Sequence, residues 1–160
     1  MENDQAIELM SVLESNDQII NIIKEKKYDS MVCLQAIPFL RLEEKDEREV
    51  LRILKKIKYE PQICVAALTF LKKEKNVMRI IKKSGYVPEV CQAAISSLNL
   101  GNKSESKIMS ILNQVKYDLA ICEASISYLK KESNLLKILK KNGYNKRLVT
   151  VVMKRLETLK

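Results

Sequence analysis

Five tyrosines recur along the chain at alternating intervals of 31 and 27 residues: Tyr28, Tyr59, Tyr86, Tyr117 and Tyr144. A cysteine follows each of the first four by five residues, at Cys33, Cys64, Cys91 and Cys122, and Val149 takes that place after the fifth. Self-similarity at such a period is typical of helical repeat proteins. Because the intervals alternate, the higher unit is a pair of repeats 58 residues long.

The residues before each tyrosine predict one helix, and the residues after it predict a second. Positions nine, eight, six and five before the tyrosine are apolar in all five copies, and on a helix they share one face. Positions four, five, eight, nine and twelve after it are apolar or small, again on one helical face. We name these helix A and helix B. We expect the intervals to alternate because the linker from B to A is four residues longer in every second repeat.

The N-terminal segment copies the helix B pattern between Gln5 and Leu13, with Ala6 at the position of the cysteines. The sequence therefore predicts an all-α fold, in which a half-repeat over residues 1–16 precedes repeats of about 17–45, 46–75, 76–104, 105–133 and 134–160. One A–B pair is too small to bury its own apolar face, so stacked neighbours bury it together. We expect one domain without an internal boundary.

Short A–B pairs such as residues 77–98 resemble HEAT repeats. The run Pro88-Glu89-Val90, followed by Ala93-Ala94, is similar to the start of helix B in the short phycobilisome-lyase-type HEAT repeat. The resemblance implies a right-handed α-solenoid that acts as a binding scaffold and is not an enzyme. A minority of HEAT-like proteins are DNA glycosylases for alkylated bases. Nothing in this chain matches their pocket residues, and tryptophan is absent, so that function ranks third.

The composition excludes several kinds of chemistry. Histidine is absent, which removes histidine-based acid–base catalysis and most zinc sites. With three glycines, a Gly-rich phosphate loop is excluded. No apolar run reaches the ~18–20 residues of a membrane span, and the N-terminus lacks the features of a secretory signal. We expect no cofactor, no metal and no membrane association.

The four cysteines occupy one repeat position, where Ala6 and Val149 also stand. Stacked layers lie ~8–10 Å apart, too far for a disulfide, whose Cα atoms are within about 7 Å. We therefore predict that this position is a slot for a small apolar side chain, with a metal or redox role as the alternative. Unpaired thiols favour a reducing compartment, so we expect a cytoplasmic protein.

Basic residues recur on helix A opposite its apolar face, at positions seven, four and three before the tyrosine. The basic ridge, as we call them, comprises Arg52, Lys55, Lys56, Arg79, Lys82, Lys83, Lys137, Lys140 and Lys141. The fourth repeat interrupts it with Ser110, Asn113 and Gln114. The net charge of +9 and the stacking of repeats would let such a ridge follow a phosphate backbone. The alternative is a solvated outer face.

Helix B carries small, nearly neutral residues with an aromatic flank at positions ten and eleven after the tyrosine. Our candidate partner-binding residues are Thr69, Phe70, Ser96, Ser127 and Tyr128. In HEAT arrays helix B usually lines the concave side, so the resemblance makes this stripe a candidate groove for a protein or peptide. The alternative is that the aromatic rings pack against adjacent B helices. The sequence thus predicts a non-enzymatic interaction scaffold, with nucleic-acid or acidic-partner binding through the basic ridge as the second candidate.

Overall fold

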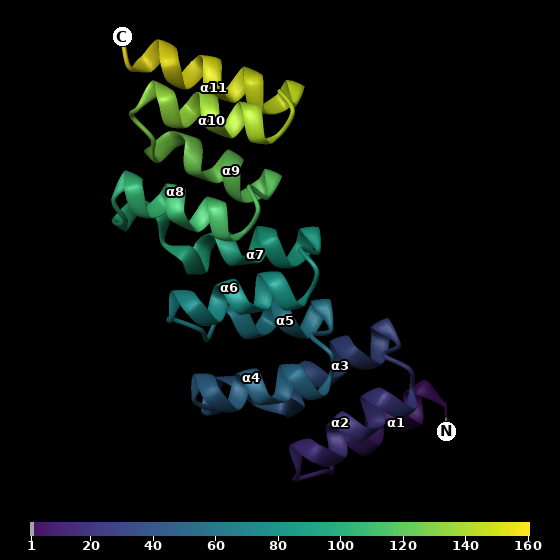
Figure 1. The fold of residues 1–160 in the computed structure, drawn as a ribbon. Helices are drawn as coiled ribbons and strands as arrows, with labels where there is room; N and C mark the ends of the chain where they lie inside the picture. The colour runs from purple at the N-terminus through teal and green to yellow at the C-terminus, as the bar shows by residue number, and fades with distance from the viewer. Residues whose placement is uncertain (1) are drawn as a thin grey trace. The chain divides into compact units, whose positions relative to one another are not determined.

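The computed structural model describes residues 2–160, and within this range the fold is all-helical, without a strand (Figure 1). The α-helices are α1 (Asn3–Met10), α2 (Asn16–Glu25), α3 (Ser30–Leu40), α4 (Glu47–Lys56), α5 (Pro61–Leu68), α6 (Glu74–Lys83), α7 (Pro88–Leu98), α8 (Glu105–Gln114), α9 (Leu119–Ser125), α10 (Glu132–Lys141) and α11 (Lys146–Thr158). Short 3₁₀ helices follow three of them: η1 (Leu42–Glu44), η2 (Leu100–Asn102) and η3 (Ile126–Tyr128). The prediction of an all-α fold is confirmed.

The helix bounds follow the register of the tyrosines. Each helix A (α2, α4, α6, α8 and α10) runs from twelve to three residues before its tyrosine, and the helix B after that tyrosine begins two residues past it. An acidic or amide side chain one residue past the tyrosine caps four of these B helices at Asp29, Glu60, Asp118 and Asn145. Both helices predicted around each tyrosine are present.

The predicted source of the alternating intervals is wrong. Every linker from helix B to the next helix A has five or six residues, whereas helix B has 11 residues in α3 and α7, 8 in α5 and 7 in α9. In the 31-residue intervals, the residue directly after helix B has a left-handed backbone conformation, Arg41 after α3 and Asn99 after α7. In the 27-residue intervals, helix B is shorter, and Leu71 and Leu129 are buried in the core although they lie in the linker after it.

Each tyrosine closes the end of helix A in a left-handed backbone conformation. The φ angles of the five tyrosines lie between 52° and 59°, and the residue before each also has a positive φ. The tyrosine N–H donates to the carbonyl oxygen five residues earlier, as from Tyr117 to Leu112 at 2.7 Å. A bond of this span with left-handed residues is the Schellman type of helix end, which satisfies carbonyls that the helix leaves unpaired. Glycine precedes the tyrosine only at Gly85 and Gly143.

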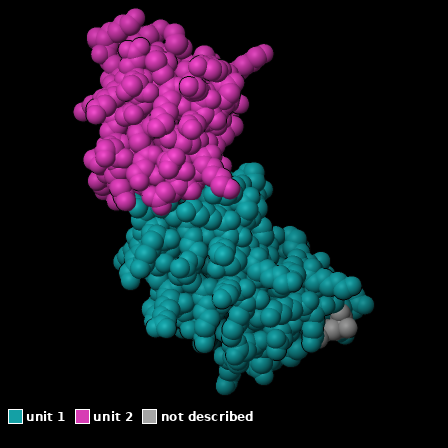
Figure 2. Space-filling model, in the orientation of Figure 1, with its two compact units in different colours: residues 1–93 teal, residues 94–160 magenta. Residues whose placement is uncertain are grey.

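The chain forms two compact units, residues 1–93 and 94–160, which are coloured separately in Figure 2. In the first, α1 contacts α3, α3 contacts α5, and α2 contacts α4, so that helices B lie on helices B and helices A on helices A. In the second, α8 contacts α9 and α10 contacts α11, with η3 between α9 and α11. The solenoid and the single domain stay predictions.

Candidate functional site

The cysteine position lies in the core. Cys33, Cys64, Cys91 and Cys122 are buried and form no disulfide, and Ala6 of α1 is equally buried at the same register. Burial, with nearby carboxylates, raises the pKa of Cys33 and Cys64 from 9.0 to about 12. These thiols are therefore protonated near neutral pH and poor nucleophiles. Among residues 2–160, no three His, Cys, Asp or Glu side chains are grouped to hold a metal ion.

The length and composition of the helices bear on whether residues 2–160 could cross a membrane. Within the described part of the chain, no helix combines the length and the apolar character that crossing a membrane requires. The longest, α11, has 13 residues and bears several charges.

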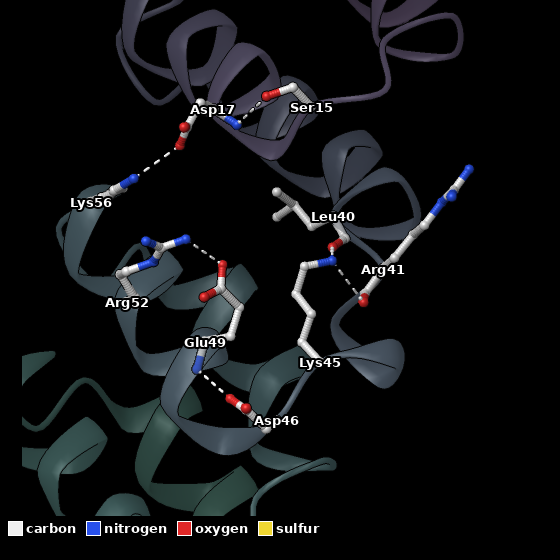
Figure 3. Close-up of polar contacts among 9 residues, drawn as sticks. All are labelled: Ser15, Asp17, Leu40, Arg41, Lys45, Asp46, Glu49, Arg52 and Lys56. Atoms are coloured by element: carbon white, nitrogen blue, oxygen red, sulfur yellow. Dashed lines mark hydrogen bonds and ion pairs between the residues drawn. The ribbon is translucent and has the colours of Figure 1, made fainter.

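The basic ridge faces solvent but is partly neutralised on α4. Lys56 Nζ lies 2.9 Å from Asp17 Oδ1 on α2, and Arg52 lies 2.7 Å from Glu49 on its own helix (Figure 3). The hydrogen bond from Lys56 and its charge hold the pKa of Asp17 below its ordinary value. These are exposed ion pairs, which are weak and screened by salt. On α4, therefore, Lys55 is the ridge residue that forms no ion pair within residues 2–160.

The ridge residues of α6 and α10 have their charges available. Arg79, Lys82 and Lys83 on α6 are exposed and form no ion pair within residues 2–160. On α10, the same holds for Lys137 and Lys140. Lys141 places its Nζ 5.7 Å from the centre of the Tyr117 ring, a cation–π distance. The structure therefore presents exposed cations on α6 in the first unit and on α10 in the second.

The five candidate partner-binding residues are divided between the two units. Thr69 and Phe70 follow α5 in the first unit, where the Thr69 hydroxyl donates to the Ala66 carbonyl and Phe70 is 39% exposed. In the second unit, Ser96 is exposed on α7, and Ser127 and Tyr128 are exposed in η3, where Tyr128 is 47% accessible. Both aromatic rings thus contact solvent, and neither is buried between helices B.

A groove that our sequence analysis did not identify crosses α3 and α5 in the first unit. It has a volume of about 700 Å³. Its lining is mainly apolar and comprises Leu34, Ile37, Glu60, Pro61, Gln62, Val65, Ala66 and Glu89. Leu34 is 51% exposed and lies beside further apolar side chains of the groove, so its exposed surface is part of a continuous apolar patch. The signal was present in the sequence, because positions six and seven after the tyrosine are outward positions and Leu34, Val65 and Ala66 occupy them.

A second, polar pocket of about 410 Å³ surrounds Tyr128 in the second unit. Its other lining residues are Gly101, Lys103, Glu105, Ser127, Lys130 and Arg155. The Tyr128 ring lies against Gly101, so close that a Cβ at that glycine would be 3.2 Å from the ring's Cε1 atom. The structure therefore places Ser127 and Tyr128 beside three cationic side chains rather than in an apolar groove.

Comparisons with known proteins add no relative. No family model matches the chain, and no curated protein or solved structure matches it. The resemblance to HEAT repeats accordingly rests on the residues quoted above, and the surfaces of the two units are what indicates a function.

Proposed function

We propose that this chain is a non-enzymatic protein-interaction module of HEAT-like repeats, which binds a partner segment in the apolar groove across α3 and α5. The observation that carries the proposal is the groove itself, where Leu34, Ile37 and Val65 present apolar surface to solvent. Exposed apolar surface of this kind on a helix that also packs into a core marks a contact surface. The groove lies on the helix B side, where the sequence analysis placed partner binding.

The charges at the rim define the partner's chemistry. Glu60 and Glu89 line the groove, and no lysine or arginine does. One carboxylate oxygen of Glu60 accepts the Ile63 N–H at the start of α5, which fixes that side chain in place. The occupant that complements this surface is a protein segment with apolar side chains flanked by lysine or arginine. The apolar part would enter the groove and the cations would meet the two glutamates.

A peptide-display experiment tests this proposal. A library of random peptides would be selected on the full chain, and the enriched peptides measured for affinity by fluorescence anisotropy. We expect apolar sequences flanked by basic residues, whose affinity falls by about tenfold or more for Leu34→Glu. Leu136→Glu is the matched control, because Leu136 is a similarly exposed leucine on α10 that does not line the groove. Unchanged binding to Leu34→Glu, or equal loss in both variants, would overturn the proposal.

The second candidate function, nucleic-acid binding through the basic ridge, is favoured by a separate observation. The cations of α6 and α10 are exposed and unpaired, as described above. Such groups can neutralise phosphates and release counterions, which makes the affinity strongly dependent on salt. The basic ridge and the α3–α5 groove consist of different residues, so charge reversal of the ridge leaves the groove unchanged.

A further inference from the structure

The two units differ sharply in charge. Residues 94–160 contain thirteen Lys and Arg against five Asp and Glu, whereas residues 1–93 contain sixteen against fifteen. Nearly all of the chain's net charge of +9 therefore resides in the second unit. This unit also holds the polar pocket around Tyr128, which is separate from the groove of the proposed function. A concave site in a strongly basic unit attracts anionic ligands.

The backbone beside the pocket orients the charged group of one lining residue, Arg155, and a second cation, Lys130, lies on the segment after η3. Arg155 on α11 donates from Nε to the Leu129 carbonyl at 2.9 Å, which fixes the plane of its guanidinium group at the pocket. Lys130 lies two residues past the end of η3, and its backbone N–H donates to Glu105. A fixed guanidinium with a neighbouring ammonium is the arrangement that favours a phosphate group.

The one carboxylate of the pocket is already engaged. Glu105 Oε1 accepts the backbone N–H groups of Lys130 and Lys131 and the Nδ2 group of Asn134, at 2.9–3.1 Å. These bonds hold the pKa of Glu105 below its ordinary value, even though burial alone would raise it. The lowered pKa keeps Glu105 ionised at neutral pH, so one negative charge faces the three cationic side chains of the pocket and the lining keeps a net positive charge.

The same register 58 residues earlier provides an internal comparison. Four lining positions keep their chemical type: Lys45, Glu47, Thr69 and Lys72 correspond to Lys103, Glu105, Ser127 and Lys130. Three positions differ: Glu43, Phe70 and Ser97 correspond to Gly101, Tyr128 and Arg155. Each difference favours an anion in the second copy, because one removes a negative charge, one adds a hydroxyl donor and one adds a guanidinium.

We propose that this pocket binds the phosphate group of a nucleotide, whose base stacks on the ring of Tyr128. Arg155 and Lys130 contact the phosphate, and the hydroxyls of Ser127 and Tyr128 are further donors at its edge. Gly101 leaves one side of the ring without a side chain, so the ring lies close to the backbone there and its exposed surface is free for stacking. Aromatic rings beside cationic groups bind successive nucleotides of single strands in this way.

Titrations of the full chain test the proposal, with adenosine 5′-monophosphate, ribose 5-phosphate, inorganic phosphate and a single-stranded hexanucleotide as probes. Binding would be followed by amide chemical shifts at Ser127 and Tyr128 and by calorimetry. We expect the nucleotide to bind about tenfold more tightly than ribose 5-phosphate, because the base adds stacking. A hexanucleotide that binds through the pocket as well shows that a strand, and not only a free nucleotide, is accepted.

Three variants test the residues. Lys130→Ser and Arg155→Ser should each weaken the binding of adenosine 5′-monophosphate by about tenfold, because each removes a charged partner of the phosphate. Gly101→Glu should abolish it, since it restores the charge of the first copy and also crowds the Tyr128 ring, whose Cε1 atom would lie 3.2 Å from the new Cβ. Lys72→Ser, at the equivalent position of Lys130 in the first copy, is the matched control and should have no effect. Thermal unfolding shows which variants fold, and Lys130→Ser keeps its backbone bond to Glu105.

Several results would overturn the proposal. One is the absence of any nucleotide binding at millimolar concentration. Another is equal affinity for inorganic phosphate and for adenosine 5′-monophosphate, which would exclude stacking. A third is a loss of binding in Lys140→Ser/Lys141→Ser with none in Lys130→Ser, which would assign the anion to the basic ridge. The peptide groove is tested with different residues, so its failure and the failure of the pocket are distinguishable.

Discussion

The carboxylate of Glu47 on α4 accepts a hydrogen bond of 3.1 Å from Nδ2 of Asn76 on α6, and another of 3.2 Å from the backbone N–H of Lys73. Lys73 stands at the N-cap of α6, and its own side chain caps nothing. The pair α8 and α10 behaves alike, because Glu105 at the start of α8 accepts from Asn134 and from the N–H of Lys131, the N-cap of α10. A glutamate at the start of one helix A thus caps the start of the following helix A.

These glutamates should contribute more to stability than other surface acids. We expect Glu47→Ala to lower the free energy of unfolding by about 1–2 kcal/mol, because the start of α6 loses the carboxylate that accepts from Lys73 and Asn76. Glu105→Ala should behave alike for α10. Glu49→Ala is the control, since Glu49 forms an exposed pair with Arg52, of the kind that contributes at most about 1 kcal/mol. Urea denaturation of the three variants measures the difference, and equal effects would contradict the capping role.

The same bonds predict the direction of a pH dependence. Burial raises the pKa of Glu47, but hydrogen bonds from Asn76 and from the backbone near Lys73 outweigh it and hold the pKa below its ordinary value of 4.5. A lowered pKa in the folded state means that the carboxylate stabilises the fold above the unfolded pKa. That contribution to stability is lost as the pH falls through the pKa that Glu47 has in the folded state.

Stability should therefore fall as the pH drops from about 6 to about 3, and the double variant Glu47→Gln/Glu105→Gln should lose less over this interval, because neither glutamine takes up a proton. Urea denaturation at a series of pH values measures both slopes. Asp17→Asn, which removes an exposed partner of Lys56, serves as the comparison. Parallel pH profiles for the wild type and the glutamine variant would refute the assignment.

The tyrosine turn predicts a stabilising substitution. Lys27 has a φ of 54°, a conformation that costs a residue with a Cβ about 1 kcal/mol and glycine nothing. Glycine already fills the equivalent position at Gly85 and Gly143. We expect Lys27→Gly to raise the free energy of unfolding by up to about 1 kcal/mol, less the entropy that glycine adds to the unfolded chain.

Lys58→Gly relieves the same strain but removes a second interaction. Lys58 Nζ lies 5.8 Å from the centre of the Tyr28 ring, a contact that contributes about 0.5–1 kcal/mol at an exposed site. The gain from this substitution should therefore be smaller than the gain from Lys27→Gly. Thermal unfolding of both variants and of Gly85→Lys, which should be destabilised, measures the series. A destabilised Lys27→Gly would show that the turn is not strained.

The register of the helices could be predicted from local pattern, whereas their lengths could not. Both helices around Tyr28 follow from apolar spacing, since the same spacing recurs in five copies. The apolar pattern correctly predicted that Leu71 and Leu129 are buried. It could not predict that they lie in the linker after the α-helix, because a residue can reach the core from either place. The cap by Glu47 joins residues 29 apart in the sequence, so only packing brings them together.

The candidate sites show the same division. That Tyr128 and Phe70 are exposed agrees with their sequence position, but the neighbours of Tyr128 come from η2, from the start of α8 and from α11. No local pattern relates Gly101 or Arg155 to Tyr128, because their distance in space depends on how the helices pack. The α3–α5 groove differs, since Leu34 and Val65 stood at outward positions and could have been identified.

Substitutions at the buried cysteine position should be tolerated according to the size and polarity of the new side chain. Cys64→Ala should lower the free energy of unfolding by about 1 kcal/mol, because it removes one buried sulfur and alanine already fills this position at Ala6. Cys64→Asp should prevent folding, since it would bury a charge without a partner. Thiol titration with and without denaturant checks the same site, and we expect reaction in denaturant alone. Rapid labelling of the folded protein would contradict the burial.

Charge reversal on α6 decides whether the basic ridge binds nucleic acid. The substitutions Arg79→Glu, Lys82→Glu and Lys83→Glu should leave the helical circular-dichroism spectrum intact, because all three side chains are exposed. If the ridge contacts phosphates, binding of a double-stranded oligonucleotide by the wild-type chain falls steeply with salt, and the variant loses most of it. The conservative triple variant to Gln separates lost attraction from added repulsion and should bind with intermediate affinity. Peptide binding at Leu34 should be the same in all three proteins, since the groove lies on α3 and α5. Salt-independent binding, or binding that survives the reversal, would remove the ridge as a nucleic-acid surface and leave the Tyr128 pocket as the place to look for phosphate recognition.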